Sequence, residues 1–155
     1  MARRSYDWGY LQPAFSERPR VSDAAVQIAL PGSTLFQQMR IETAVVNTSR
    51  GAEYIQGARQ EPEGWMQYLD YDRLVFPLIA RFRRAGDTFR PLGMQGKKSL
   101  KKFFIDRKVP RHKRKSIPVL VDGDGIIGIV GVSIAERVKI TPQTRTIVAI
   151  RVYYR

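Results

Sequence analysis

The sequence predicts an α+β domain: a small mixed or antiparallel sheet, or barrel-like module, with one capped basic helix over about residues 99–108. Three observations indicate this class. Short apolar segments recur along the chain between glycine and proline turns, which is typical of strands. One segment has helical spacing instead. With 43% hydrophobic residues among 155, the chain can bury the core of one ordinary domain.

The first part of the chain predicts an arm followed by strands. Residues 1–22 are arginine-rich and have no apolar period, which indicates an N-terminal arm, flexible or extended, ahead of a domain over 23–155. Glycine and proline predict a loop over 49–64, and a helical turn is expected over 70–74. Apolar patterns predict four strands before the basic segment, over residues 23–30, 35–48, 65–69 and 76–82.

The clearest helix covers 99–108. Ser99 can accept a hydrogen bond from the first free amides, as an N-cap residue does. Val109 precedes Pro110 and therefore resists helical geometry, which ends the helix near Lys108. The apolar positions follow i, i+3, i+4 spacing and form one core-facing stripe: Leu100, Phe103 and Phe104.

The last part of the chain predicts a hairpin and a closing strand. Residues 111–116 form a short basic link that could make one helical turn. Asp122 to Gly125 is a strong hairpin turn, with glycine at two of its four positions. It lies between strands expected over 118–121 and 126–132, and alternation over 145–153 predicts the closing strand.

Positive charge is concentrated in one segment. Residues 81–115 hold fourteen Lys and Arg against two acids, a net +12 of the chain's +13. Such a run is often only a solvated charged face. Here it also contains phenylalanines, so we expect it to be folded. Lysine and arginine at phosphates release condensed counterions, so a polyanion, nucleic acid above all, is the expected partner.

Several kinds of chemistry are excluded or disfavoured. There is no cysteine, and His112 is the single histidine, so thiolate metal sites, histidine metal clusters and a Ser–His–Asp triad are unavailable. No apolar run is long enough to span a membrane, and no apolar stretch follows the first residues as in a secretory signal. Asp70 and Asp72 show no sign of catalysis, and the glycines and acids of 122–133 fit neither a phosphate loop nor a calcium loop. We expect no catalytic or metal residues, and a cytoplasmic protein.

One stretch of the sequence has a more specific pattern of residues than the rest. It runs from Arg84 through Arg90-Pro91-Leu92-Gly93 and Gly96-Lys97-Lys98-Ser99 to Pro110-Arg111, two glycine turns that lead into the basic helix. Together with Leu69-Asp70-Tyr71-Asp72 upstream and Ile117-Pro118-Val119 and Glu136-Arg137 downstream, it resembles the C-terminal domain of tRNA(Ile)-lysidine synthetase. The resemblance covers about residues 64–155. Ala85, Thr88 and Gly128 depart from residues common in that family.

The resemblance implies a function. The family uses ATP and magnesium to join lysine to the wobble cytidine of tRNA(Ile), in an N-terminal ATP-pyrophosphatase domain whose Ser-Gly-Gly-x-Asp-Ser loop is absent from this sequence. Its C-terminal domain helps to recognise the tRNA. No cofactor is therefore expected in this chain, whose partners would be tRNA and a fused or separate catalytic domain. The phosphate contacts that we expect are Arg81, Arg83, Arg84, Arg90, Lys97, Lys98, Lys101, Lys102, Arg107, Lys108, Arg111 and Arg114.

Two alternatives remain open at this point. The chain could be a general RNA- or DNA-binding protein that shares the module, which competition between nucleic acids would reveal. It could instead be a protein-interaction domain whose positive charge meets an acidic partner. The sequence also leaves open whether the chain is part of a longer protein, a truncated gene product or a separate subunit.

Overall fold

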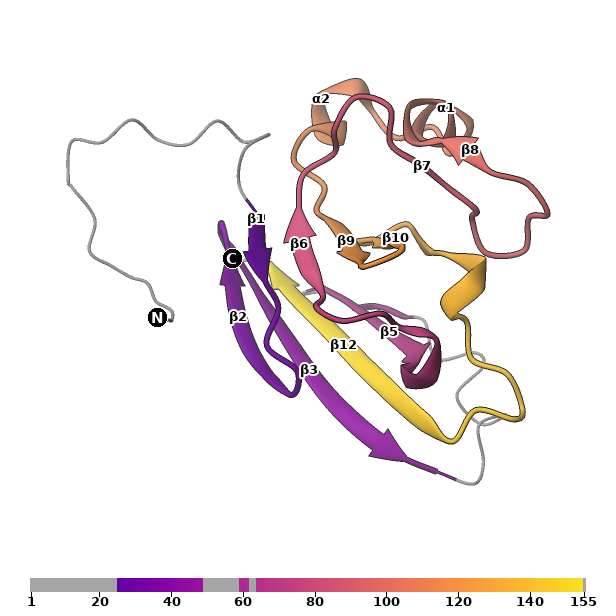
Figure 1. The fold of residues 1–155 in the computed structure, drawn as a ribbon. Coiled ribbons are helices and arrows are strands. Elements are labelled where there is room, and N and C mark those ends of the chain that lie inside the picture. Colours follow the sequence, from indigo (N-terminus) through magenta and orange to yellow (C-terminus); the bar gives the residue numbers. More distant parts are fainter. Residues whose placement is uncertain (1–24, 49–58, 62–63, 155) are drawn as a thin grey trace.

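A computed structural model describes residues 25–48, 59–61 and 64–154. The expected N-terminal arm and most of the expected loop over 49–64 lie outside these residues. The described chain forms an α+β fold in which all paired strands are antiparallel (Figure 1). The fold class expected from the sequence is confirmed, although the strands form two five-stranded sheets and a two-stranded ribbon.

The first sheet carries the hairpin that the sequence predicts. Its strands, in spatial order, are β1 (Ala25–Gln27), β6 (Ile79–Arg81), β9 (Val119–Asp122), β10 (Gly125–Ile129) and β11 (Ser133–Ile134). Asp122 pairs with Gly125 across the tight turn. β11 and the one-turn helix η4 (Glu136–Val138) were not predicted, because neither is long enough to show an apolar period.

The second sheet is built around the last strand. Its order is β2 (Gly32–Phe36), β3 (Met39–Asn47), β12 (Thr146–Tyr154), β5 (Gly64–Asp70) and β4 (Arg59–Glu61). β12 pairs with β3 along all nine residues and with β5 along seven. The expected closing strand is therefore the central strand of its sheet, because two long strands from the first half of the chain enclose it.

Two further differences from the prediction concern the strands expected over 35–48 and 76–82. The strand expected over 35–48 is a hairpin, since the chain turns at Gln37, whose φ of 55° lies in the left-handed region. No glycine or asparagine marks this turn, so no local pattern predicted it. The strand expected over 76–82 is only β6, since Pro77 has no N–H to donate to a ladder.

One core joins both sheets and the basic helix. β12 contributes Val148, Ile150 and Val152, all at most 1% exposed, and the Phe36 ring lies 4.9 Å from that of Phe82, which follows β6. Phe103 and Phe104 of the helix belong to the same buried cluster. The basic segment is therefore part of the folded domain, as its phenylalanines indicated.

The basic segment folds as short elements at one end of the molecule. These are β7 (Thr88–Phe89), β8 (Lys98–Ser99), α1 (Leu100–Asp106) and α2 (Arg111–Arg114). Figure 1 shows α1, α2 and β8 together, at the end away from the N-terminal end of β12. Within the described part of the chain, no helix is long and apolar enough to cross a membrane.

Candidate nucleic-acid interface

Helix α1 forms much as its sequence predicts. The Ser99 hydroxyl accepts a hydrogen bond from the Lys102 amide at 3.1 Å, so Ser99 is the N-cap. The Leu100 amide donates to the Asp87 carbonyl at 2.8 Å, which attaches the start of the helix to the preceding loop. The predicted apolar stripe is at most 2% exposed: Leu100, Phe103 and Phe104. This burial turns the lysines between these positions toward solvent.

The end of α1 is a tight C-terminal turn. The Val109 amide donates to the Phe104 carbonyl and the Lys108 amide to the Ile105 carbonyl, both at 3.0 Å. This pair of bonds is the Schellman pattern, which requires a left-handed residue. Lys108 occupies that position with a φ of 57°. The helix therefore ends at Asp106, two residues earlier than predicted.

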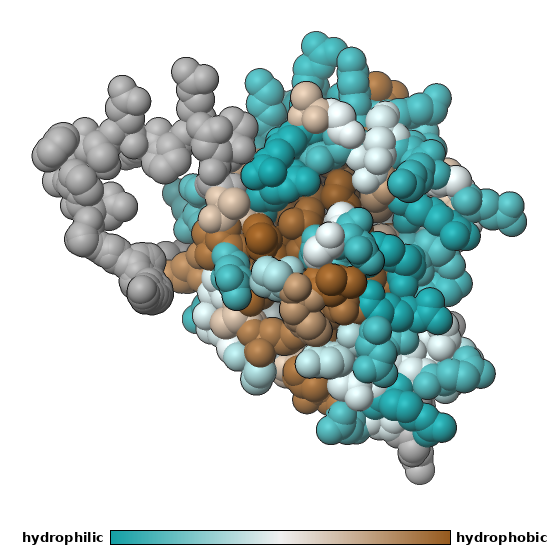
Figure 2. Space-filling view, in the orientation of Figure 1, coloured by the Kyte–Doolittle hydropathy of each residue, from teal (hydrophilic) through white to brown (hydrophobic). Residues whose placement is uncertain are grey.

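Most of the cations predicted to contact phosphate are exposed. Three are half-buried: Arg83, Lys98 and Arg114. Eight are exposed: Arg84, Arg90, Lys97, Lys101, Lys102, Arg107, Lys108 and Arg111. Figure 2 shows hydrophilic surface over the end that carries α1 and α2, and hydrophobic surface nearer the sheets. Below, the cationic end means residues 81–115.

Arg81 is an exception. Its side chain is 11% exposed, and its guanidinium donates to both carboxylate oxygens of Asp87 at 3.0 Å and to the Phe82 carbonyl at 2.9 Å. Burial alone would raise the pKa of Asp87, but the bonds from Arg81 and from the Arg84 amide outweigh it and hold that pKa below its usual value. In this conformation Arg81 fixes the loop rather than facing an external phosphate. Its acidic partner is six residues along the chain, so the sequence alone did not show the pair.

Few of the other cations are neutralised. Lys98 contacts Asp106 at 2.6 Å, and this hydrogen bond lowers the pKa of Asp106. Across the described residues, no other lysine or arginine of the cationic end lies within 4.0 Å of a carboxylate. Among the described residues, the fourteen cations of residues 81–115 thus have two close acidic partners, and the positive charge seen in the sequence persists in this part of the fold.

Aromatic and backbone contacts hold several of these side chains in place. The Arg107 guanidinium lies 4.8 Å from the centre of the Phe103 ring, and that of Arg83 lies 5.9 Å from the Phe104 ring. Arg114 donates to the Val109 carbonyl at 2.9 Å. Such contacts reduce the conformational entropy lost when a guanidinium binds phosphate.

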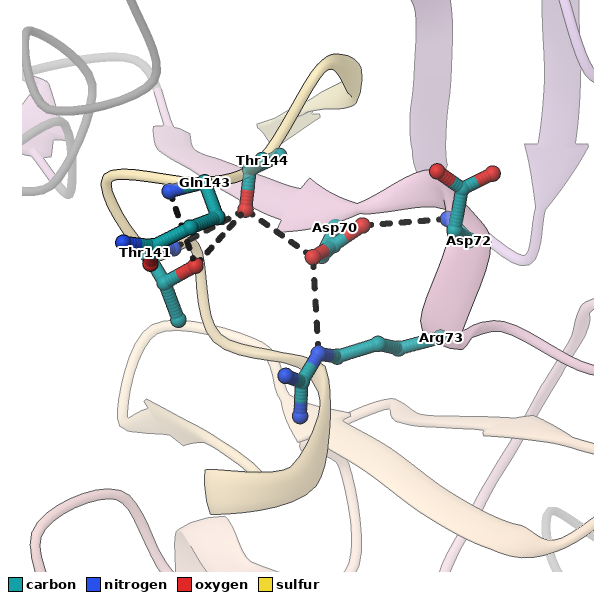
Figure 3. A network of polar contacts seen from close by, with 6 residues as sticks. All are labelled: Asp70, Asp72, Arg73, Thr141, Gln143 and Thr144. Carbon is teal, nitrogen blue, oxygen red and sulfur yellow. Dashed lines mark hydrogen bonds and ion pairs between the residues drawn. The ribbon is translucent and has the colours of Figure 1, made fainter.

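Of the two acids considered for catalysis, Asp70 has a structural role. Its carboxylate accepts hydrogen bonds from the Asp72 amide at 3.1 Å and the Thr144 hydroxyl at 2.9 Å, and Arg73 lies 3.4 Å away (Figure 3). Asp70 thereby caps the one-turn helix η3 (Tyr71–Arg73) and pairs with Arg73. Among the described residues, no cluster of acidic or histidine side chains could hold a metal ion.

Sequence reasoning missed a cleft at the edge of the cationic end, which supplies most of its lining. Its volume is about 690 Å³, and Arg90 and Lys97 line it together with residues of the β9–β10 turn and of η4. Arg137 forms one wall and donates to both carboxylate oxygens of Asp122, at 2.6 and 3.1 Å. The matched Glu136-Arg137 pair was the available signal, but only the fold brings it next to the basic loop.

Fold and site together define a class: a small antiparallel α+β domain whose cationic end has few close carboxylates among the described residues, which suits a polyanion. The comparisons with known proteins show what this chain is similar to. Residues 78–152 match the family model of the TilS substrate C-terminal domain. The chain thus resembles the C-terminal domain of tRNA(Ile)-lysidine synthase, and the resemblance predicted from the sequence is confirmed.

Curated proteins with similar sequences support this resemblance. The chain is 32% identical over 124 residues to a tRNA(Ile)-lysidine synthase of Caldanaerobacter subterraneus subsp. tengcongensis, covering 79% of this chain and 25% of the relative. It is 36% identical over 125 residues to that of Symbiobacterium thermophilum, covering 81% and 25%. This chain therefore spans about a quarter of the length of these relatives.

Solved structures agree on the fold. A crystal structure of a TilS C-terminal domain aligns with a TM-score of 0.63 at 21% identity, covering 84% of this chain and 98% of that one. An N-terminal fragment of the phenylalanyl-tRNA synthetase β-subunit from Pyrococcus horikoshii aligns with a TM-score of 0.54 at 18% identity, covering 60% and 29%. At these identities the likeness concerns the fold alone.

Proposed function

We propose that this domain binds tRNA, as the tRNA-recognising C-terminal part of a tRNA(Ile)-lysidine synthase. The observation that carries the proposal is the set of exposed cations at one end of the fold that have no acidic partner nearby among the described residues. A-form RNA is bound largely through its phosphates, its 2′-hydroxyls and its shape, and exposed lysines and arginines suit the phosphates.

The proposed contact set follows the exposure of the side chains. It omits Arg81 and Lys98, because the carboxylates of Asp87 and Asp106 occupy their charged groups. Lys101 and Lys102 belong to it, since burial of the apolar stripe of α1 turns them outward. The full set is Arg83, Arg84, Arg90, Lys97, Lys101, Lys102, Arg107, Lys108, Arg111 and Arg114.

The proposed role in the reaction is recognition. In such an enzyme the ATP and magnesium chemistry on the wobble cytidine belongs to an ATP-pyrophosphatase domain, fused to this one or on a separate chain. The present domain would hold the body of tRNA(Ile) and supply no catalytic group. This role is that of a cytoplasmic tRNA-modifying protein.

Charge reversal tests the surface. Lys101→Glu and Lys102→Glu, singly and together, should weaken tRNA binding, and the log–log salt slope should shrink by about one for each phosphate that the protein no longer neutralises. The double variant should bind about ten-fold or more weakly at moderate salt. The measurement is the dissociation constant of a labelled tRNA over a series of salt concentrations.

Arg145→Glu is the matched control. Arg145 is exposed and directly precedes β12, a strand whose N-terminal end lies away from α1 (Figure 1). This variant makes the same change in net charge and should alter binding far less. Equal effects at positions 101 and 145 would mean that net charge alone drives binding, and would contradict a defined surface.

Competition separates the proposal from its alternatives. tRNA(Ile) with a CAU anticodon should displace the label better than duplex DNA does. Equal displacement by all nucleic acids would favour a general nucleic-acid-binding protein. Association that survives nuclease and high salt would favour a protein partner.

A further inference from the structure

The cleft at the edge of the cationic end has the size of a small-ligand site. Its volume of about 690 Å³ is within the range of about 300–1,000 Å³ for ligand pockets. It opens between the loop over residues 86–97, the β9–β10 turn and η4. Arg90 and Lys97 belong both to this cleft and to the proposed phosphate-binding set. A ligand in the cleft therefore lies next to RNA held at the cationic end.

The walls of the cleft are fixed by paired groups. Arg81 is held by both oxygens of Asp87, and Arg137 by both oxygens of Asp122. The outer loop is attached to η4, because the Gly93 amide donates to the Glu136 carboxylate and the Glu136 amide to the Arg90 carbonyl, both at 2.9 Å. Little ordering is then needed on binding, which favours affinity.

The lining combines an apolar floor with a polar rim. Three residues at most 5% exposed contribute to the floor: Phe89, Ile126 and Ala135. Exposed polar side chains stand around it: Thr88, Gln95 and Asp124. The rim thus offers hydrogen-bond donors and acceptors, and Arg90 and Lys97 add positive charge. A flat base with polar edges and adjoining phosphates matches this combination.

We propose that the cleft holds one unpaired nucleotide of the bound RNA. Its base lies over the apolar floor, Asp124, Gln95 and Thr88 contact the base edge, and Arg90 and Lys97 contact the flanking phosphates. The Asp124 carboxylate only accepts hydrogen bonds, so it favours bases with an exocyclic amino group over uracil. This inference rests on the proposed function, since the cationic end must first bind RNA.

The test compares a blunt-ended RNA hairpin with the same hairpin extended by one unpaired 3′ nucleotide or interrupted by a one-nucleotide bulge. The intact chain should bind at least one unpaired form several-fold more tightly than the blunt form, and the gain should be smaller with uracil. Asp124→Ala should abolish the gain while leaving blunt-duplex binding equal or tighter, because it removes a negative charge near RNA.

Because Asp124→Ala should lose the gain from the unpaired nucleotide while keeping or improving blunt-duplex binding, this variant separates contact with the base from general electrostatics. Asp72→Ala, which removes another exposed acid outside the cleft, should keep the gain. Gln95→Ala should reduce the gain, and it serves as a second variant that leaves the β9–β10 turn intact. Unfolding curves of each variant confirm that it is folded.

The outcomes are distinguishable. A blunt hairpin that binds without any gain from an unpaired nucleotide would overturn the cleft proposal and leave the proposed function standing. A gain retained in both Asp124→Ala and Gln95→Ala would overturn it as well. No binding of any RNA by the intact chain would overturn both proposals.

Discussion

The second sheet and the cationic end are built in opposite ways. β3 and β12 are nine residues long and pair along their full length, whereas the elements of the cationic end other than β6 have two to seven residues. Outside the cationic end, Arg40, Arg73, Arg137 and Lys139 each lie close to a carboxylate. Within it, only Arg81 and Lys98 do so among the described residues.

The difference separates stability from binding. The sheets bury continuous apolar faces, which supply most of the folding free energy in such domains. The cationic end repels itself and is attached to that core by a few aromatic side chains, among them Phe89 and Phe103 with ring centres 5.0 Å apart. Changes in the sheets should therefore alter folding, and changes in exposed side chains of the cationic end should alter RNA binding.

The largest effect is expected at Gly64. A Cβ at this position would overlap the carbonyl oxygen of Val152 on the central strand, and the paired backbones cannot move apart without breaking ladder bonds. Gly64→Ala should lower the free energy of unfolding by about 4 kcal/mol or more, which urea unfolding measures. If the variant does not fold, circular dichroism will show the loss of the β-sheet signal.

Gly96→Ala is the matched change in the cationic end, where a Cβ meets nothing within 4 Å. Its stability should stay within about 0.5 kcal/mol of the parent. A Gly64→Ala variant as stable as Gly96→Ala would contradict the claim that stability depends on the sheets more than on the cationic end.

A smaller effect is expected at Asp122, whose side chain is fully buried beside Arg137. Burial opposes its ionisation, but the bonds from Arg137 and from the Val75 and Asp124 amides outweigh this and hold the pKa of Asp122 below its usual value. Asp122→Asn should destabilise the fold by about 1.5–3 kcal/mol at pH 7, since it removes hydrogen bonds to a charged group.

The pH dependence follows from the direction of the shift. The folded-state pKa is lower than that of the unfolded chain, about 3.9, so the pair stabilises the protein above that pH. This stabilisation is lost as the pH falls through the folded-state pKa. Unfolding at pH 7 and pH 3 should therefore show a smaller difference between parent and variant in acid.

Asp106→Asn is the control in the cationic end, where the Asp106 carboxylate is exposed. It should change stability little and tighten RNA binding slightly, because Lys98 is released. A loss of stability as large as that of Asp122→Asn would show that ion pairs matter equally in both regions.

The smallest effect, and the most discriminating, is expected at Lys108. Its left-handed conformation disfavours any side chain, so Lys108→Gly should leave stability equal or raise it by about 1 kcal/mol. The same variant removes one exposed cation and should weaken tRNA binding and reduce the salt slope. A variant with equal or higher stability and weaker tRNA binding would support the contrast between the two regions. A decrease in both stability and binding would contradict it.

Local signals predicted part of this molecule well. Ser99 as N-cap, the buried stripe of α1 and the turn after Asp122 all depend on residues a few positions apart, so their sequence patterns are direct. The turn at Gln37 was missed because a residue without turn preference adopts the required φ. Arg81 was predicted as an external contact because its charge was visible in the sequence and its pairing with Asp87 was not.

The sequence by itself determined the α+β class, the capped basic helix, the excess of positive charge and the resemblance to the C-terminal domain of tRNA(Ile)-lysidine synthase. Only the tertiary structure decided that β12 is central, that Arg81 is occupied, and that Arg90, Lys97 and Asp124 border one cleft. The reason is the separation along the chain. Charge and helix caps act between near neighbours, whereas strand order and clefts arise from contacts between segments up to 115 residues apart, as Met39 and Tyr154 are. No local pattern encodes such contacts.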